Sequence, residues 1–173
     1  MAETLIITFI ARDRPGVVEQ LSEVVEARGG NWLESRMAHL AETFAGVARV
    51  QVDKAGSAAL QSALGDLGED GFQVTVHVAG EGGGAARGAV VDFAIVGPDH
   101  PGIVHELTRT VAGLKASVEE METWIEGAPH GGGTLFHARA SVRLPAGLSE
   151  EDFRDALEQS ANALVVDIVI GEE

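Results

Sequence analysis

An internal repeat constrains the fold of this chain more than any other feature of its sequence. The segment LIITFIARDRPGVV at 5–18 corresponds to VDFAIVGPDHPGIV at 91–104, so an Asp-x-Pro-Gly motif recurs at an offset of 86 residues. Three pairs of segments align in the same order along the 173-residue chain, which indicates a duplicated unit and not a chance match. The pairs are 5–18 with 91–104, 44–52 with 136–144, and 72–78 with 164–170.

The repeat also predicts where the domains end. Residues 79–89, AGEGGGAARGA, are rich in Gly and Ala and are typical of a flexible linker. We therefore expect a first domain over residues 1–78 and a second over residues 90–173. The second copy is longer by about six residues, which fall in the Gly-rich loop EGAPHGGGT at 126–134.

Each copy begins with the same two predicted elements. Apolar, branched residues at 4–11 and 89–96 predict buried strands, and the Asp-x-Pro-Gly turn follows each of them. Apolar residues then recur at helical spacing, which predicts an amphipathic helix after each turn. On its apolar face we expect Val17, Val18, Leu21, Val24 and Val25 in the first copy, and Ile103, Val104, Leu107, Val111 and Leu114 in the second.

The remaining elements complete a known fold class. Two strands follow the first helix, a second apolar-striped helix follows them, and a last strand ends each copy. The order βαββαβ predicts an α+β fold of two ferredoxin-like units, each an antiparallel four-stranded sheet with both helices on one face. We expect the two units to pack side by side. The two inner strands are predicted at 31–40 and 44–53, then at 117–126 and 134–143.

The Asp-x-Pro-Gly turn has the chemistry of a binding site. Pro15 suits the first position of a helix, whose first N–H groups attract an anion, and Gly16 allows a ligand to approach the backbone. A carboxylate at Asp13 would attract a cation, so the turn suits a free amino acid, which carries both charges. The other interpretation is that Asp13 simply caps the helix. In the second copy the same positions are occupied by Asp99, Pro101 and Gly102.

In each copy a polar residue begins the strand that follows the first helix. The amide of Asn31 can both donate and accept hydrogen bonds, so it could bind either end of a zwitterion, or it could serve only as a turn residue after Gly29-Gly30. The second copy has the shorter Ser117 at this position, so the two halves need not bind a ligand equally.

Composition excludes several classes of protein. There is no Cys, and therefore no disulfide, thiolate metal site or Cys nucleophile. The net charge of −15, of which residues 79–173 carry −10, argues against direct nucleic-acid binding. No apolar run is long enough for a membrane span, and the N-terminus lacks a secretory signal, so we expect a cytoplasmic protein that does not bind membranes. No cofactor, metal site or catalytic constellation is expected.

Some residues have two interpretations. Trp32 and Trp124 both fall in the second strands of the copies, where packing is favoured over a contact with another domain or subunit. Glu119, Glu120 and Glu122 form either a solvated acidic face or a partner-binding surface. His130 is a candidate for a solvated loop residue, and the spacing of His100 and His105 does not favour a metal site.

The pattern D-x-P-G-[VI]-V, followed by an amphipathic helix and a polar strand start, resembles the ACT domain. ACT domains have the order βαββαβ and sense amino acids at the interface between two such domains. The tandem arrangement with VGPDHPGIV also resembles the glycine cleavage system transcriptional repressor family. Carried over by position, the resemblance implies ligand contacts at Asp13, Arg14, Pro15, Gly16, Val17 and Asn31, and at Asp99, His100, Pro101, Gly102, Ile103 and Ser117.

The resemblance implies a non-catalytic, amino-acid-sensing regulator, with glycine or serine as the favoured ligand. Because the sequence has no basic stripe, control of glycine metabolism genes would act through a protein partner such as a transcriptional activator. A homodimer is also expected. Two alternatives stay open: a protein-interaction module without a functional ligand pocket, and a detached regulatory domain of a metabolic enzyme.

Overall fold

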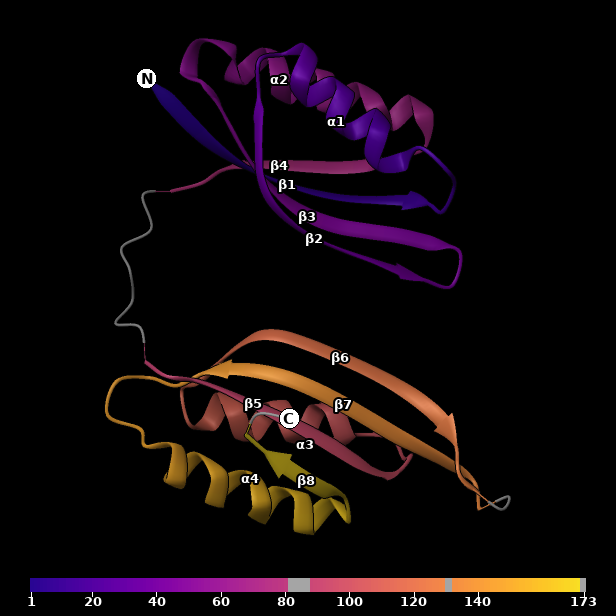
Figure 1. Ribbon diagram of the computed structural model, residues 1–173, viewed down its shortest axis with the longest axis vertical. Coiled ribbons are helices and arrows are strands. Elements are labelled where there is room, and N and C mark those ends of the chain that lie inside the picture. The colour runs from indigo at the N-terminus through magenta and orange to yellow at the C-terminus, as the bar shows by residue number, and fades with distance from the viewer. Residues whose placement is uncertain (81–87, 130–131, 172–173) are drawn as a thin grey trace. The chain divides into compact units, whose positions relative to one another are not determined.

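The computed structural model describes residues 1–80, 88–129 and 132–171 (Figure 1). The chain divides into two compact units, Met1–Gly83 and Gly84–Glu173. Most of the predicted linker, and His130 in the predicted loop at 126–134, lie outside the described residues. Among the described residues, no helix combines the length and the apolar character that a membrane span requires.

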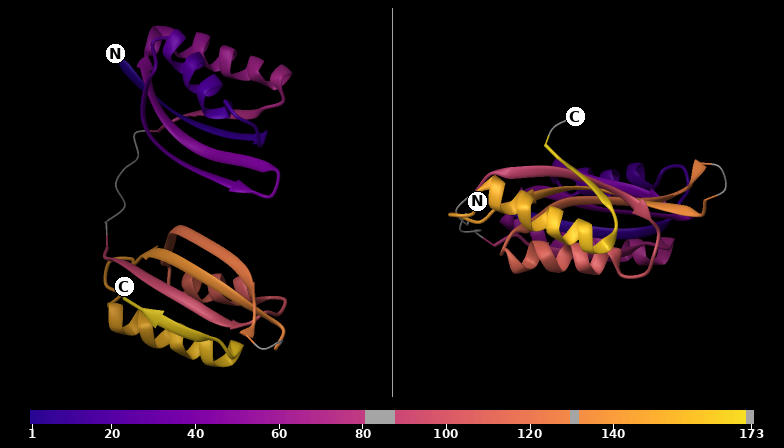
Figure 2. Two further views of the ribbon diagram at one scale, coloured as in Figure 1. Left: turned by 45° about the vertical axis from the view of Figure 1, so that its right-hand side comes forward. Right: turned by 90° about the horizontal axis from the view of Figure 1, so that it is seen from below.

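The first unit has the predicted order of elements. Its four strands form one antiparallel sheet in the order β2-β3-β1-β4, so that β1 lies inside the sheet, between β3 and β4. Both long helices cover the same face of this sheet, as Figures 1 and 2 show. The elements are β1 Ala2–Arg12, α1 Val17–Ala27, β2 Asn31–Leu40, β3 Thr43–Asp53, α2 Lys54–Asp66, the short 3₁₀ helix η1 Leu67–Asp70, and β4 Gln73–Val78.

The second unit repeats this topology. Its sheet has the order β6-β7-β5-β8, again antiparallel throughout, with both helices on one face (Figure 2). The α+β class and the ferredoxin-like βαββαβ order predicted from the sequence are therefore confirmed in both units. The elements are β5 Val90–Pro98, α3 Ile103–Gly113, β6 Ser117–Gly127, β7 Thr134–Arg143, α4 Glu150–Leu164 and β8 Asp167–Ile170.

Each unit has its own hydrophobic core between the helices and one face of the sheet. Side chains alternate along a strand, so every second residue of β1 is buried, with Leu5, Ile7 and Phe9 at most 1% exposed. Leu21 of α1 and Leu60 of α2 are fully buried against them. The second core is built the same way around residues that occupy matching positions: Val91, Phe93, Ile95, Leu107, Phe153 and Leu157.

The predicted helical faces were wrong at one position in each copy. Val18 and Val104 are 41% and 43% exposed, although the sequence pattern placed them on the buried face. The buried stripe of α1 is formed by Val17, Leu21 and Val25. At about 100° per residue, Val18 lies about 60° around the helix from the centre of that stripe, so it falls at its margin.

A β-bulge occurs at the same place in both copies, which the sequence analysis did not predict. The register of β2 against β3 shifts between Trp32 and Glu34, and that of β6 against β7 shifts between Val118 and Glu120. A bulge inserts one extra residue, so the side-chain alternation changes face beyond it. Trp32, before the bulge, packs against the first core.

The two tryptophans consequently have different environments. Trp124 lies well beyond the bulge in β6, on the sheet face that carries no helices, where its ring stacks on His137 at a centroid distance of 5.0 Å. The expectation that both tryptophans pack is correct for Trp32 in the helix-covered core. Trp124 instead packs against side chains of the open face.

The cores predict a measurable contrast within one helix. Leu21→Ala removes a fully buried side chain, so we expect a loss of about 2–5 kcal/mol in the unfolding free energy of the first unit. Val18→Ala, three residues away on the same helix, should change it by about 0.5 kcal/mol or less. Urea unfolding followed by circular dichroism measures both, and equal losses would contradict the assignment of the buried stripe.

Candidate functional site

The turn between β1 and α1 is built around a glycine that no other residue replaces without strain. Gly16 is the N-cap of α1 and has φ of 89°, in the left-handed region. Pro15 therefore precedes the N-cap, which corrects the prediction that it occupies the first helical position. Because Gly16 has left-handed dihedral angles, the regular helix begins one residue later, at Val17.

The start of α1 presents free backbone donors. The first helical hydrogen bond is donated by the N–H of Gln20 to the carbonyl of Gly16, at 2.9 Å, so the N–H groups of Val17, Val18 and Glu19 precede it. No side chain among the described residues caps this end. The interpretation that Asp13 serves as a simple helix cap is therefore wrong, and these donors remain available to an anion.

Asp13 is held at the rim of this turn by contacts on two sides. Its backbone N–H donates to the carbonyl of Glu42 in the hairpin between β2 and β3, at 2.9 Å. Its carboxylate lies 3.3 Å from Nε2 of His39 and is about half exposed. A hollow of about 300 Å³ lies beside it, and its lining residues are Asp13, Arg14, Gly16, Val17, Val18, Glu19 and Phe44.

The side chain of Arg14 connects the turn to the segment before β4. Its guanidinium donates to Oε1 of Gln20 at 2.7 Å, and the amide of Gln20 donates to the carboxylate of Asp70 in η1 at 2.7 Å. The same guanidinium lies over the ring of Phe72, 5.8 Å from its centroid. A displacement of Arg14 would therefore change its contact with Phe72, in the segment that leads into β4, and its link through Gln20 to Asp70.

The equivalent turn of the second unit has the same backbone but a different side chain across it. Gly102 is the N-cap of α3 with φ of 99°, and no side chain among the described residues caps that helix. The N–H of Asp99 donates to the carbonyl of Thr134 at 2.9 Å. His100, at the position of Arg14, places Nδ1 3.2 Å from the Pro101 carbonyl and Nε2 3.2 Å from that of Leu164 at the end of α4.

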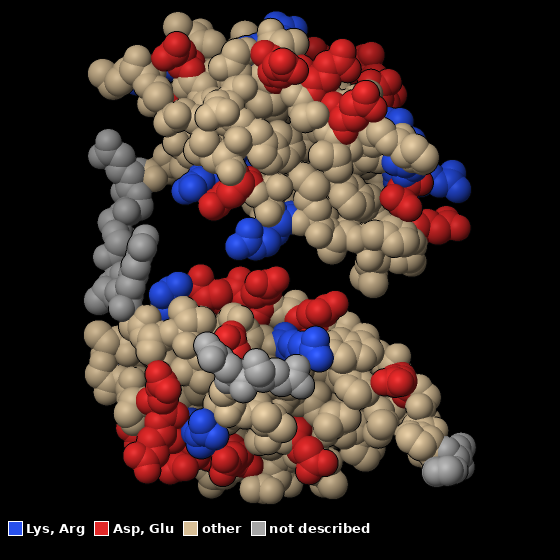
Figure 3. Space-filling view, in the orientation of Figure 1, with Lys and Arg blue, Asp and Glu red and all other residues tan. Residues whose placement is uncertain are grey.

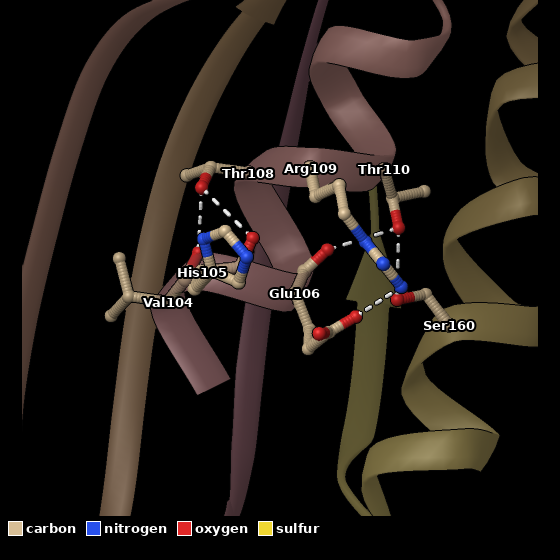
Figure 4. Close-up of polar contacts among 7 residues, drawn as sticks. All are labelled: Val104, His105, Glu106, Thr108, Arg109, Thr110 and Ser160. Atoms are coloured by element: carbon tan, nitrogen blue, oxygen red, sulfur yellow. Dashed lines mark hydrogen bonds and ion pairs between the residues drawn. The ribbon is translucent and has the colours of Figure 1, made fainter. Parts of the chain in front are cut away.

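Side chains in the first turns of α3 bond to their own helix and to α4 (Figure 4). The hydroxyl of Thr108 donates to the carbonyls of Val104 and His105, and that of Thr110 bonds to Ser160 of α4. Glu106, which corresponds to Gln20, pairs with Arg109. In the second unit the counterpart of Gln20 therefore pairs within α3, and the hydroxyl of Thr110 joins α3 to α4.

The structure separates the predicted site residues into two groups. Asp13 to Val17 come together at one turn, and Asp99 to Ile103 at the other, although Val17 and Ile103 are only 4% and 2% exposed because their side chains enter the cores. These two residues therefore offer backbone groups to a ligand and no side chain. Their side chains therefore do not fill either turn.

Asn31 and Ser117 do not join the turn of their own unit. Asn31 pairs with Gln51, which pairs in turn with Thr4 near the start of β1, whereas the turn follows the other end of β1. Ser117 likewise pairs with Arg143, which lies opposite Val90 at the start of β5. Within one unit, the two parts of the predicted site lie at opposite ends of the sheet.

Several contact residues of the turn were not found by sequence reasoning. His39 and Glu42 belong to the β2–β3 hairpin, and only the pairing register brings that hairpin to the turn. Gln20 and Asp70 are common surface residues in the sequence and gave no signal of their own. Among the described residues, no group of three or more His, Asp or Glu side chains could hold a metal ion.

Comparison with known proteins assigns this architecture to a family. Residues 3–78 match the family model described as the ACT domain. The first unit therefore matches the ACT domain over nearly its whole length. The second unit lies outside the matched residues, but it has the same element order, sheet order and glycine-capped turn as the first.

Two solved structures resemble the whole chain. A crystal structure of an unknown protein from Galdieria sulphuraria has a TM-score of 0.84 and 29% identity, and the match covers 100% of this chain and 99% of that one. A second, described as a candidate glycine cleavage system transcriptional repressor, has a TM-score of 0.74 and 17% identity, with 99% and 97% covered. No curated protein sequence matches the chain significantly.

The left-handed backbone of the turn predicts a glycine-specific requirement. Gly16→Ala places a Cβ at φ of 89°, so we expect a loss of about 1–2 kcal/mol in unfolding free energy. Gly65→Ala, in the last turn of α2 with no atom within 4 Å of the added Cβ, is the matched control and should gain up to about 1 kcal/mol. A stabilising Gly16→Ala would show that the turn does not need the left-handed conformation.

Proposed function

We propose that this chain is a tandem ACT-domain protein and a non-catalytic sensor of a small amino acid, with glycine or serine as the first candidates. One observation carries the proposal. At the first turn, a glycine N-cap leaves the N–H groups of Val17 to Glu19 without helical partners, beside the half-exposed carboxylate of Asp13 and a hollow of about 300 Å³. A cluster of donors next to a carboxylate suits a zwitterion with a small side chain.

In the proposed complex, each end of the ligand meets the opposite charge. The ligand carboxylate accepts hydrogen bonds from the start of α1, where the helix dipole favours an anion. The ligand ammonium lies against Asp13. Asn31 cannot contribute within its own unit, because it lies at the opposite end of the sheet. We therefore propose that the second strand of a neighbouring ACT unit supplies the amide or hydroxyl, as the family resemblance implies.

The two turns should not contribute equally. The second turn is crossed by His100, which contacts backbone carbonyls on both sides, whereas Arg14 in the first turn bonds through a side-chain relay. A ligand at the first turn can displace Arg14 and so act on Gln20, Asp70 and the segment before β4. We propose that the first turn is the stronger site and the source of the signal.

The proposed output is a change in association, because a ligand that binds two units at once favours the arrangement in which both contact it. The similar fold of the candidate glycine cleavage repressor supports a role in regulating glycine metabolism genes. We propose that the protein acts in the cytoplasm through a protein partner, such as a transcriptional activator. The net charge of −15 argues against an action through direct contact with DNA.

Calorimetry with the twenty amino acids tests the sensing proposal. We expect saturable heat with glycine or serine, and an affinity at least tenfold lower for Asp13→Ala because the ammonium loses its partner. Asp99→Ala should have the smaller effect. Glycinamide, which keeps the ammonium but lacks the carboxylate, should bind more weakly than glycine, because the donors of α1 then have no anion to bind.

Asp66→Ala serves as the matched control, since Asp66 is an exposed carboxylate at the end of α2 and is not among the residues that line the hollow at the first turn. It should leave the affinity unchanged. No saturable heat with any amino acid at millimolar concentration would refute the sensing proposal. Binding that is unchanged in both Asp13→Ala and Asp99→Ala would refute the assignment of the site while leaving sensing intact.

A further inference from the structure

Each sheet has a second face that the helices do not cover, here called the open face. It is defined in the first unit by three rows of residues that pair across the sheet. The same rows occur in the second unit at offsets of 86 for the first two strands of each unit, 92 for the third strand and 94 for the last. In the first unit the rows are Glu34–Arg49–Ile6–His77, Arg36–Val47–Thr8–Thr75 and Ala38–Ala45–Ile10–Gln73. In the second unit the corresponding rows are Glu120–Ser141–Asp92, Glu122–Arg139–Ala94–Val169 and Trp124–His137–Val96–Asp167.

The open face of the first unit is basic and apolar. It carries two arginines and one glutamate in the three rows, although the chain as a whole is acidic. Glu34 pairs with Arg49 at 3.2 Å, whereas the guanidinium of Arg36 donates to the carbonyl of its neighbour Ser35. Ile10 and Val47 are 47% and 38% exposed beside them. The exposed Arg36, on the edge strand β2, therefore presents a cation beside an apolar surface.

The open face of the second unit has the opposite charge. The same three rows carry four carboxylates and one arginine, and Figure 3 shows acidic side chains gathered over this unit. Glu122 stands where the first unit has Arg36, and Asp92 stands where it has Ile6. Most core positions of the two units correspond, including Leu5 with Val91, Ile7 with Phe93 and Leu21 with Leu107. The duplicated copies have therefore diverged in charge on this face while the fold was kept.

The acidic open face is also hollowed. A depression of about 460 Å³ lies over its first two rows, with Asp92, Glu120 and Glu122 around it and the small side chains of Ala94 and Ser141 at its floor. A second depression of about 180 Å³ adjoins it at Ala94, Arg139 and Val169 and reaches the ring of Trp124. The depression therefore has room for a long cationic side chain among carboxylates.

We propose that the open face of the second unit binds the open face of the first unit in a second copy of this chain. Charge complementarity carries the proposal: the central rows oppose Arg36 to Glu122, and the apolar residues Ile10 and Val47 have Ala94, Val169 and Trp124 to pack against. The Arg36 side chain enters the depression between Glu120 and Glu122. The contact is reciprocal, so two copies form a closed two-fold dimer with two such contacts.

The area of these faces supports two contacts and not one. Four strands spaced about 4.8 Å apart, over about seven residues of about 3.3 Å each, give a face of about 440 Å². One pair of faces would then bury about 900 Å², less than the about 1,200 Å² typical of a stable interface, whereas two pairs reach about 1,800 Å². The reciprocal dimer also leaves no open face exposed to further copies.

Sedimentation velocity of the full chain tests this proposal, without any amino acid present, so its outcome is independent of the sensing proposal. We expect the wild type to sediment at twice the 18.0 kDa mass of one chain at micromolar concentration. Arg36→Glu and Glu122→Arg should each raise the dimer dissociation constant at least tenfold, because each places like charges opposite one another. The double variant R36E/E122R restores the opposite charges and should recover most of the affinity.

Two matched controls separate this contact from a general effect of charge. Glu158→Arg makes the same charge change on the exposed surface of α4 and should leave the dimer intact. Glu122→Gln removes the charge without reversing it and should weaken the dimer less than Glu122→Arg. A monomer at all concentrations up to about 100 μM, or a dimer that neither charge reversal weakens, would overturn the proposal. So would a double variant weaker than both single ones.

Discussion

Each unit of this protein buries only one face of its sheet, and every functional surface follows from that constraint. The strands alternate apolar and polar residues, so two helices suffice to cover the apolar face and form a core. The helices must then cross back over the sheet, and each first helix starts directly after the strand that lies inside the sheet. Two kinds of surface are then available for binding: the turns where those helices begin, and the sheet faces that the helices do not cover.

The duplication shows which of these places changed. Both copies keep the glycine N-cap with positive φ and the hydrogen bond from the N–H of Asp13 or Asp99 to the neighbouring hairpin or strand. The turn is therefore the feature common to both copies. The residue that crosses the turn and the charge of the open face differ, which gives one chain two units of the same fold with unequal chemistry.

The fold followed from the sequence because it depends on periodicity, and periodicity can be read residue by residue. The site was predictable only in part. The turn is a local motif, so Asp13 to Val17 were placed together correctly, whereas Asn31 depends on strand register, which puts it at the far end of the sheet. The β-bulge after Trp32 had no sequence signal, and without it the different environments of Trp32 and Trp124 could not be predicted.

The central claim is that the start of α1 receives the carboxylate of a small amino acid. A titration of the ¹⁵N-labelled chain with glycine and with serine, followed residue by residue in amide correlation spectra, tests it most directly. The account predicts saturable shifts that are largest at Val17, Val18 and Glu19, with smaller shifts along Gln20 and Asp70. Spectra that do not change at millimolar amino acid, or shifts confined to residues away from both turns, would contradict it.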